Sequence, residues 1–400
     1  KTFGQQYFEK TAYVNFDNNA RMKQVFEGDL DIERLVLSIS AETGVSIEAE
    51  NTLIIFDEVQ EVPKALTSLK YFYENAPQYA IVAAESLLGV ALHQGTSFPV
   101  GKVDFLDLYP LNFREFLCAM GEKQFVSMLD SCDTQMVTVF KTKYIERLRE
   151  YYFVGGMPEV VKDFSEKKDY NRVRAIQKNL INYYQQDFSK HAEIKLVPRL
   201  NLVWNSIPMQ LAKENKKYIY GQVREGSRAK DFELAIQWLL DCGLIHKVQR
   251  IQKPDLPLKA YIDFDAFKLF LVDIGLLIAM TDLDAKVIIE GNKIFTEFKG
   301  ALTEQYILQQ LISDVGVIPY YYSTQNSKGE IDFLVQGKTS VIPIEVKAEE
   351  NLKAKSLKAF CEKYQPSYAV RTSMSDYREQ DWMTNIPLYA VKWIKNYVNQ

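Results

Sequence analysis

The sequence of 400 residues predicts an α/β protein built from several domains. Short apolar runs rich in β-forming residues alternate with helical stretches over residues 1–105. Residues 106–196 carry apolar residues at helical spacing and show no strand alternation. Strand and helix patterns return further along the chain, which predicts a module at 197–289 and a last α/β domain at 290–400.

Composition limits the classes of protein to which the chain can belong. Hydrophobic residues make up 47% and charged residues 25%, with only 18 glycines and 13 prolines, which is typical of a globular chain. The four cysteines and three histidines are scattered, so they form no zinc-binding spacing and supply little material for a Ser-His-Asp triad. No signal segment or bilayer-length apolar run is present, so we expect no membrane partner. Reduced cysteines indicate a cytoplasmic protein, and the net charge of −4 argues against a generally polybasic one.

Two carboxylates follow a buried apolar run in the first domain. Residues 52–57 read Thr-Leu-Ile-Ile-Phe-Asp and Glu58 comes next, which is the Walker B pattern. Open α/β sheets bind ligands at the carboxyl ends of their strands. We therefore predict that Asp57 holds Mg²⁺ and that Glu58 polarises the water that attacks the γ-phosphate of ATP. A strand that ends in a solvated acidic turn fits the same pattern.

Neighbouring segments predict an α/β unit around this strand. A strand at 12–16 precedes a helical stretch over about residues 20–43, and a helix over about 64–75 precedes a strand at 79–84. Ser86 follows that last strand, where a polar residue can sense the γ-phosphate. The alternative is that Ser86 is an ordinary helix N-cap.

The last domain contains a second set of charged residues in a defined order. Glu304 lies in a predicted helix, Asp332 near the start of a predicted strand, and Glu345 and Lys347 on the next strand. Residues i and i+2 of a strand face the same side, so Glu345 and Lys347 project together. We predict that Asp332 and Glu345 hold Mg²⁺, with Glu304 as an outer metal contact. Lys347 would then orient or deprotonate an attacking water. The alternative is an ordinary half-buried hairpin in which Glu345 and Lys347 form an ion pair.

Residues 197–265 read as three helices followed by a strand pair, which is the order of a winged helix. Arg224, Arg228 and Lys230 cluster before and at the start of the third helix, where recognition helices contact DNA phosphates. Basic residues outnumber acidic ones in this segment. The alternative is a protein-packing module whose basic side chains are only solvated.

Several segments together resemble a large prokaryotic family of AAA-type ATP-binding proteins with a C-terminal domain of unknown function. They are LIIFDEVQEVP (53–63), IVAAESLLG (81–89), FPVGKV (98–103), LYPLNFREFL (108–117), YYFVGGMPEVV (151–161), LFLVDIGLL (269–277) and GALTEQYIL (300–308). The resemblance implies a P-loop NTPase parallel sheet with a helical lid at 106–196, with ATP and Mg²⁺ as cofactors. The order of Glu304, Asp332 and the Glu345-x-Lys347 pair is similar to the PD-(D/E)XK nuclease core. Arg114, in the segment NFREF, would touch phosphate or pair with a neighbouring acid.

The sequence departs from the family pattern at two places. No GxxxxGK[ST] loop is found anywhere in the chain. Because the chain starts with a helix that runs into a strand, we expect the P-loop portion to lie upstream of Lys1, and without it this chain would bind ATP weakly or not at all. In addition, Glu85 replaces the glycine that relatives carry before Ser86, and its carboxylate would repel phosphate oxygens.

Two functional hypotheses from different classes follow. In the first, ATP hydrolysis positions the winged-helix module and the nuclease-like domain on nucleic acid, which the latter cleaves with Mg²⁺. In the second, the chain is a nucleotide-regulated switch, and its inactive nuclease-like domain binds a protein partner without cutting.

Overall fold

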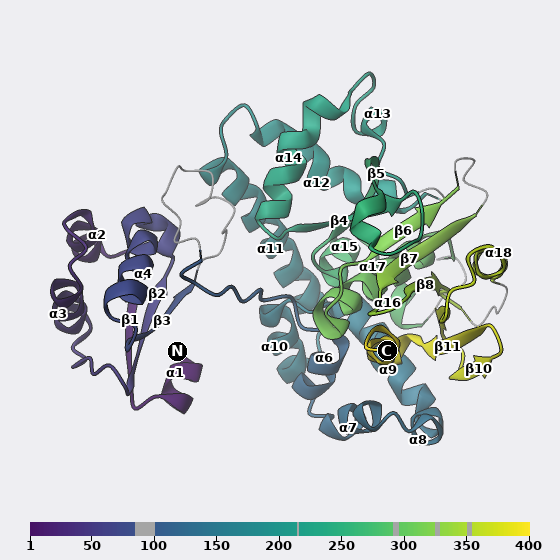
Figure 1. Ribbon diagram of the computed structural model, residues 1–400, viewed down its shortest axis with the longest axis horizontal. Helices are drawn as coiled ribbons and strands as arrows, with labels where there is room; N and C mark the ends of the chain where they lie inside the picture. The colour runs from purple at the N-terminus through teal and green to yellow at the C-terminus, as the bar shows by residue number, and fades with distance from the viewer. Residues whose placement is uncertain (85–100, 214–215, 291–295, 325–328, 350–353) are drawn as a thin grey trace. The chain divides into compact units, whose positions relative to one another are not determined.

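The computed structural model describes residues 1–84, 101–213, 216–290, 296–324, 329–349 and 354–400. The chain divides into two compact units (Figure 1). The first unit contains residues 1–108 and 237–243, and the second contains residues 109–236 and 244–400.

The described residues of the first unit form a three-stranded sheet with the order β1-β2-β3, in which both neighbouring pairs are parallel. The strands are β1 (Lys10–Asn15), β2 (Thr52–Asp57) and β3 (Ala80–Ala84). The helices are α1 (Thr2–Tyr7), α2 (Ala20–Glu27), α3 (Ile32–Thr43) and α4 (Pro63–Asn75), with a short 3-10 helix η1 (Val59–Glu61) directly after β2. The parallel sheet predicted from the sequence is therefore confirmed.

The helical stretch predicted over about residues 20–43 contains two separate helices. Helix α2 ends at Glu27, and Gly28 continues with extended backbone. The side chain of Asp31 then accepts a hydrogen bond from the backbone N–H of Arg34 at 2.9 Å, which caps the start of α3. The turn residues between α2 and α3 thus divide the predicted helical stretch into two helices.

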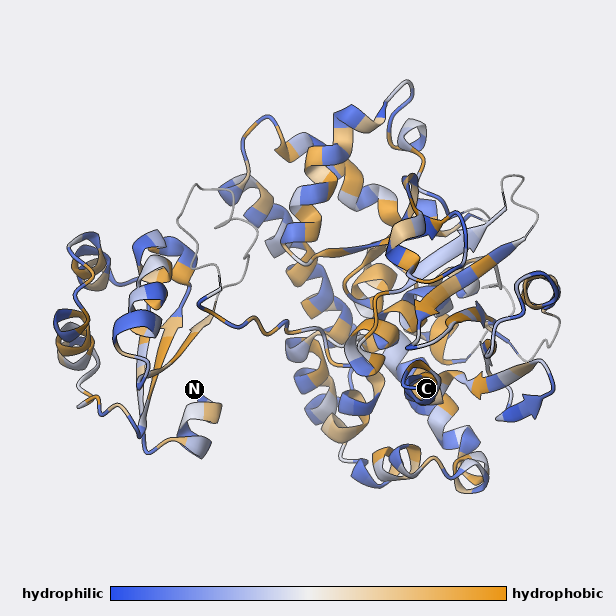
Figure 2. Cartoon of the chain, viewed as in Figure 1, coloured by the Kyte–Doolittle hydropathy of each residue, from blue (hydrophilic) through white to orange (hydrophobic). Residues whose placement is uncertain are grey.

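Apolar side chains on one face of this sheet pack against α2, α3 and α4. Figure 2 colours residues along the strands of this sheet as hydrophobic. Phe16, Phe26 and Phe56 are fully buried and contact one another edge to face, with ring centroids 5.3–5.5 Å apart. Successive residues of a strand point to opposite faces. Tyr13 and Asn15 therefore project from the face opposite the buried Ala12 and Val14.

The second unit begins with the helical region predicted from the sequence. Its helices are α6 (Phe113–Ala119), α7 (Lys123–Ser131), α8 (Thr134–Val139), α9 (Lys141–Val154), α10 (Pro158–Lys167) and α11 (Tyr170–His191). The next elements along the chain are α12 (Val197–Leu211), α13 (Tyr220–Val223), α14 (Ala229–Asp241), β4 (Ile245–Ile251), η2 (Leu258–Tyr261) and β5 (Ile262–Leu271), and the end of α14 from residue 237 is assigned to the first unit. The predicted order of three helices and an antiparallel strand pair is present among these residues.

The described strands of the second unit form one eight-stranded sheet with the order β10-β11-β9-β8-β7-β6-β4-β5. The later strands are β6 (Tyr320–Ser323), β7 (Glu330–Gln336), β8 (Val341–Val346), β9 (Val370–Ser373), β10 (Arg378–Gln380) and β11 (Met383–Pro387). Strand β4 pairs in parallel with β6 through Arg250–Tyr321 and Ile251–Tyr322. The domain boundary predicted at 289/290 therefore falls between strands of a continuous sheet.

The C-terminal part has the order helix, three strands, helix, strand. Its helices are α17 (Thr296–Gln310), which continues as the short π-helix η4 (Leu311–Val315), and α18 (Lys355–Tyr364). Strand β7 pairs antiparallel with both β6 and β8. Helix α18 connects β8 to β9, and these two strands pair in parallel. The remaining helical elements are α15 (Ile274–Met280), α16 (Ala285–Ile289), η5 (Leu388–Trp393) and α19 (Ile394–Val398). None of the helices among the described residues combines the length and the apolar character needed to cross a membrane.

Candidate functional site

Asp57 lies at the carboxyl end of β2, beside Asn15 at the corresponding position of β1. The hydroxyl of Tyr13 donates a hydrogen bond to Oδ2 of Asp57, and Nδ2 of Asn15 lies 3.4 Å from the same oxygen. The bond to Asp57 is the main reason that the pKa of Tyr13 is raised above its ordinary value. Two neighbouring side chains on β1 thus orient the Asp57 carboxylate.

The backbone of Glu58 is left-handed, with a φ of 53°, although Glu58 is not glycine. This conformation costs free energy in a residue with a Cβ, and such residues cluster at functional sites. The turn ends β2 immediately after Asp57. Nε2 of Gln60 donates a hydrogen bond to Oε2 of Glu58 at 2.6 Å and fixes its carboxylate.

The two carboxylates fit the hydrated Mg²⁺ of a nucleotide complex. Asp57 and Glu58 are half-buried at the carboxyl edge of a parallel sheet, where oxygen ligands for Mg²⁺ are expected. Ser86, the predicted γ-phosphate sensor, lies outside the described residues. Arg114 belongs to the second unit, where it pairs with Asp130 at 2.7 Å and Asp314 at 3.0 Å. The structure therefore contains the ion pair, which was one of the two roles open for Arg114.

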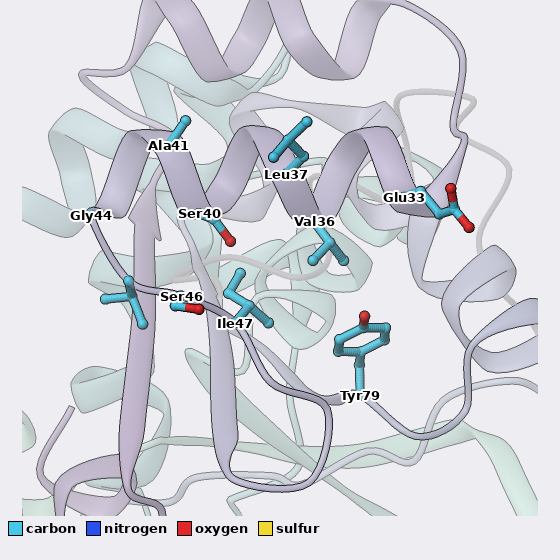
Figure 3. Close-up of a pocket in the computed structure, with 10 residues that line it drawn as sticks. Glu33, Val36, Leu37, Ser40, Ala41, Gly44, Ser46, Ile47 and Tyr79 are labelled. Carbon is cyan, nitrogen blue, oxygen red and sulfur yellow. The ribbon is translucent and has the colours of Figure 1, made fainter.

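A pocket of about 680 Å³ in the first unit does not have the lining of a phosphate site (Figure 3). It lies between α3 and the segment that follows it, and Val36, Leu37, Ile47 and Tyr79 contribute much of its lining. Glu33 is its charged lining residue, and no lysine or arginine is found among the residues that line it. A phosphate group would meet no cation there.

In the second unit, Glu304 on α17 is held between two lysines. Its side chain is 6% exposed. Nζ of Lys216 donates a hydrogen bond to Oε1, and Nζ of Lys268 lies 3.6 Å from Oε2. Burial alone would raise the pKa of Glu304, but the charges of Lys216 and Lys268 outweigh it and lower the pKa. Glu304 is therefore an ionised carboxylate inside the protein.

Lys268 on β5 is fully buried and is bound to a second carboxylate. Its Nζ donates a hydrogen bond to Oε1 of Glu330 at 2.5 Å and lies 4.8 Å from the ring centroid of Tyr321. Burial alone would lower the pKa of Lys268, but the charges of Glu304 and Glu330 outweigh it and raise the pKa. Asp332 adds to this effect. Lys268 is thus a charged ammonium at the centre of an acidic cluster.

The predicted residues on β7 and β8 lie in the same cluster. Oδ2 of Asp332 accepts a hydrogen bond from the backbone N–H of Val346 at 2.7 Å. Burial, followed by the charges of Glu304 and Glu345, raises the pKa of Asp332 well above its ordinary value. Nζ of Lys347 lies 2.5 Å from Oε1 of Glu345. The structure thus brings the four predicted residues together, with Glu345 and Lys347 on the same side of the strand.

This arrangement does not fit a Mg²⁺ ion. Mg²⁺ requires several carboxylate or water oxygens in nearly ideal octahedral geometry. Here lysine ammoniums engage Oε1 of Glu304 and Oε1 of Glu345, and a backbone N–H engages Oδ2 of Asp332, whereas Oε2 of each glutamate is buried without a hydrogen-bond partner among the described residues. Within the described ranges, no group of three or more histidine, cysteine or acidic residues is placed to hold a metal ion. The predicted Mg²⁺ ligand set of Glu304, Asp332 and Glu345 is therefore not formed in this structure.

Three charged residues of this cluster, Lys216, Lys268 and Glu330, are absent from the prediction. Lys268 stands inside the apolar run Phe267-Lys268-Leu269-Phe270-Leu271. A single charge in a run that reads as a buried strand requires a partner, because an unpaired buried ammonium is very costly. That signal marks Lys268 as a paired residue but does not reveal its partners.

Arg224, Arg228 and Lys230 are all exposed. Arg224 follows the last residue of α13, and Lys230 lies in the first turn of α14. The backbone N–H of Arg228 donates a hydrogen bond to Oδ2 of Asp231 at 2.8 Å, which stabilises the start of α14. The three basic side chains are thus presented to solvent around one helix start.

Three families match separate parts of the chain. Residues 1–117 match an AAA domain, residues 145–287 match a domain of unknown function (DUF8612), and residues 299–391 match a domain of unknown function (DUF4143). No curated protein matches the chain significantly. A Walker-type ATPase of Pyrococcus abyssi aligns with 68% of this chain and 84% of its own, with 13% identity and a TM-score of 0.38. The AAA match supports an ATPase-type function for the first unit.

Proposed function

We propose that the protein is an AAA-type ATPase whose first unit holds the Mg²⁺ of an ATP complex on Asp57. The observation that carries this proposal is the position of Asp57 at the carboxyl end of a central parallel strand, oriented by Tyr13 and Asn15. The match of residues 1–117 to an AAA domain supports it independently.

The roles of the two carboxylates follow from their chemistry. When bound, Mg²⁺ neutralises charge on the phosphates. In this proposal Asp57 would orient that ion, and Glu58 would accept a hydrogen bond from the water that attacks the γ-phosphorus. A bond forms between the water oxygen and the γ-phosphorus while the bond from the γ-phosphorus to the bridging oxygen breaks. The water proton passes to Glu58 and then to solvent, and ADP and phosphate leave. Gln60 restrains the Glu58 carboxylate during this step.

ATP hydrolysis by the protein expressed from its complete reading frame tests this proposal. Glu58→Gln keeps the size of the side chain but removes its charge, and we expect kcat to fall by about 100-fold or more while ATP still binds. Asp57→Asn is expected to weaken Mg²⁺-dependent ATP binding. Glu50→Gln, which removes the same charge from an exposed residue of the same unit, is the control. Absence of hydrolysis by the parent, or an unchanged kcat in Glu58→Gln, would exclude the assignment.

A second candidate function is binding of nucleic acid by the second unit. The observation that favours it is the exposure of Arg224, Arg228 and Lys230 around the start of α14, within a winged-helix-like order of elements. The order helix, three strands, helix, strand in the C-terminal part supports a PD-(D/E)XK nuclease-like fold. We therefore propose that ATP hydrolysis is coupled to DNA binding by this unit.

DNA binding is measured by fluorescence anisotropy at several salt concentrations. Replacing Arg224, Arg228 and Lys230 together with glutamine is expected to weaken binding. It should also reduce the slope of log K against log salt by about 0.9 for each DNA phosphate that the protein no longer neutralises. The control changes three exposed lysines, Lys123, Lys162 and Lys355, to glutamine. Equal affinities of the two triple variants would rule out this DNA contact and favour the alternative, a nucleotide-regulated switch that binds a protein partner.

A further inference from the structure

The acidic cluster of the second unit contains its own cation. Lys268 is the fully buried ammonium of this cluster, between Glu330 at 2.5 Å and Glu304 at 3.6 Å. Lys268 comes from β5, which is an edge strand of the sheet and is separated from β8 by β4, β6 and β7. The strand that supplies it therefore lies outside the helix-and-strand segment that carries Glu304, Asp332 and Glu345.

A carboxylate cluster of this kind is stable only when positive charge is present. Several buried carboxylates repel one another, and either protonation, a metal ion or basic side chains must relieve the repulsion. Nζ of a lysine is a compact point charge with three donors, so it can bridge carboxylates much as a small cation does. Lys268 donates a hydrogen bond to Glu330 and forms an ion pair with Glu304 at 3.6 Å, and Lys216 adds a second ammonium on Glu304.

We propose that the Lys268 ammonium takes the place of a divalent cation in this cluster, so that the site binds no Mg²⁺ and the domain acts by binding rather than by metal-dependent cleavage. This inference rests on the nuclease-like fold proposed above for the C-terminal part. An incidental surface ion pair does not explain the geometry, because Lys268 is fully buried and contacts two acids on different elements.

Calorimetric titration with Mn²⁺ alone, without nucleotide or DNA, tests the proposal. The parent for this experiment carries Asp57→Asn, so that the first unit contributes no nucleotide-type metal site. It is compared with the same protein carrying Asp332→Asn, which retains an oxygen acceptor for the backbone N–H of Val346. We expect identical isotherms. A saturable Mn²⁺ site in the parent that disappears with Asp332→Asn would overturn the proposal.

Lys268→Met in the same parent provides the complementary measurement, because methionine retains much of the volume and removes the charge. We expect a lower melting temperature in EDTA and partial recovery in excess Mn²⁺, which would enter the cluster in place of the ammonium. A variant that melts as the parent does under both conditions would contradict the proposal. If Lys268→Met does not fold, the Mn²⁺ titration of the parent and of Asp332→Asn still tests the proposal. Neither result depends on ATP hydrolysis or DNA binding, so failure here is distinct from failure of the proposed function.

Discussion

Oε1 of Glu330 accepts a hydrogen bond at 2.5 Å from Nζ of Lys268, and the Lys268 side chain is fully buried. Burial removes the hydration of both charges, so the pair persists only where further partners support it. Glu304 supplies that support from α17, at 3.6 Å from the same ammonium. Together these contacts connect β5 and β7 to α17.

Loss of this ammonium is expected to destabilise the second unit. Lys268→Met leaves Glu304 and Glu330 without a shared cation, and breaking a buried pair from one side costs about 3–5 kcal/mol. Urea unfolding followed by tryptophan fluorescence measures the change. The control is Lys253→Met, which removes an exposed pair with Asp255 and is expected to change stability far less. Equal effects of the two variants would contradict the central position of Lys268.

Arg114 is expected to act in stability rather than in nucleotide binding. Arg114→Met leaves Asp314, whose side chain is 7% exposed, without its partner, and we expect a loss of about 2–3 kcal/mol. Burial raises the pKa of Asp314 and Arg114 opposes that effect, so the variant also favours protonation of Asp314. Arg21→Met, at an exposed pair, is the control. A selective loss of ATP affinity without a change in the urea midpoint would instead assign Arg114 to the phosphate.

Because of His246 on β4, the free energy of unfolding is expected to decrease as the pH is lowered. Burial lowers its pKa to about 4, whereas an unfolded histidine titrates near 6.5. The unfolded chain therefore binds the extra proton first, and stability that is fully present above the unfolded pKa is lost as pH falls through the folded pKa. The full cost is on the order of 3 kcal/mol. Urea midpoints of the parent and His246→Gln should diverge between about pH 7 and pH 4.5, and parallel curves would contradict this role.

Replacement of Gly156 by any residue with a side chain is expected to destabilise the protein. A Cβ at this position would lie 2.1 Å from the backbone oxygen of Leu111. The backbone N–H of Gly156 also donates a hydrogen bond to Oδ2 of Asp273 at 2.6 Å. Gly156→Ala should therefore cost about 1–3 kcal/mol or more. Gly300→Ala is the control, because nothing lies within 4 Å of a Cβ there and alanine stabilises a helix by up to about 1 kcal/mol. Unfolding curves with the same sign for both variants would contradict the close approach.

The sequence is sufficient to predict the local elements that carry the site. An apolar run followed by two carboxylates predicts β2 and the position of Asp57, and the spacing of Glu345 and Lys347 predicts their common side. These features depend on neighbouring residues only. The break between α2 and α3 depends on the cap at Asp31, which periodicity alone does not reveal.

Long-range pairing explains what the sequence could not predict. The approach of Lys268 to Glu330 depends on β4 pairing with β6, which are about 70 residues apart in the chain. No local pattern determines that contact. The same pairing joins strands of two predicted domains in one sheet. Lys268, which lies in the module predicted at 197–289, therefore reaches the acidic cluster of the domain predicted at 290–400.

The rate of ATP hydrolysis with and without DNA tests the proposed coupling most directly. The protein expressed from its complete reading frame should hydrolyse ATP, and DNA should change kcat by several-fold. Combined substitution of Arg224, Arg228 and Lys230 by glutamine should remove the DNA effect and leave basal hydrolysis intact, whereas Glu58→Gln should remove both. Hydrolysis that is insensitive to DNA in the parent, or no hydrolysis at all, would contradict the account.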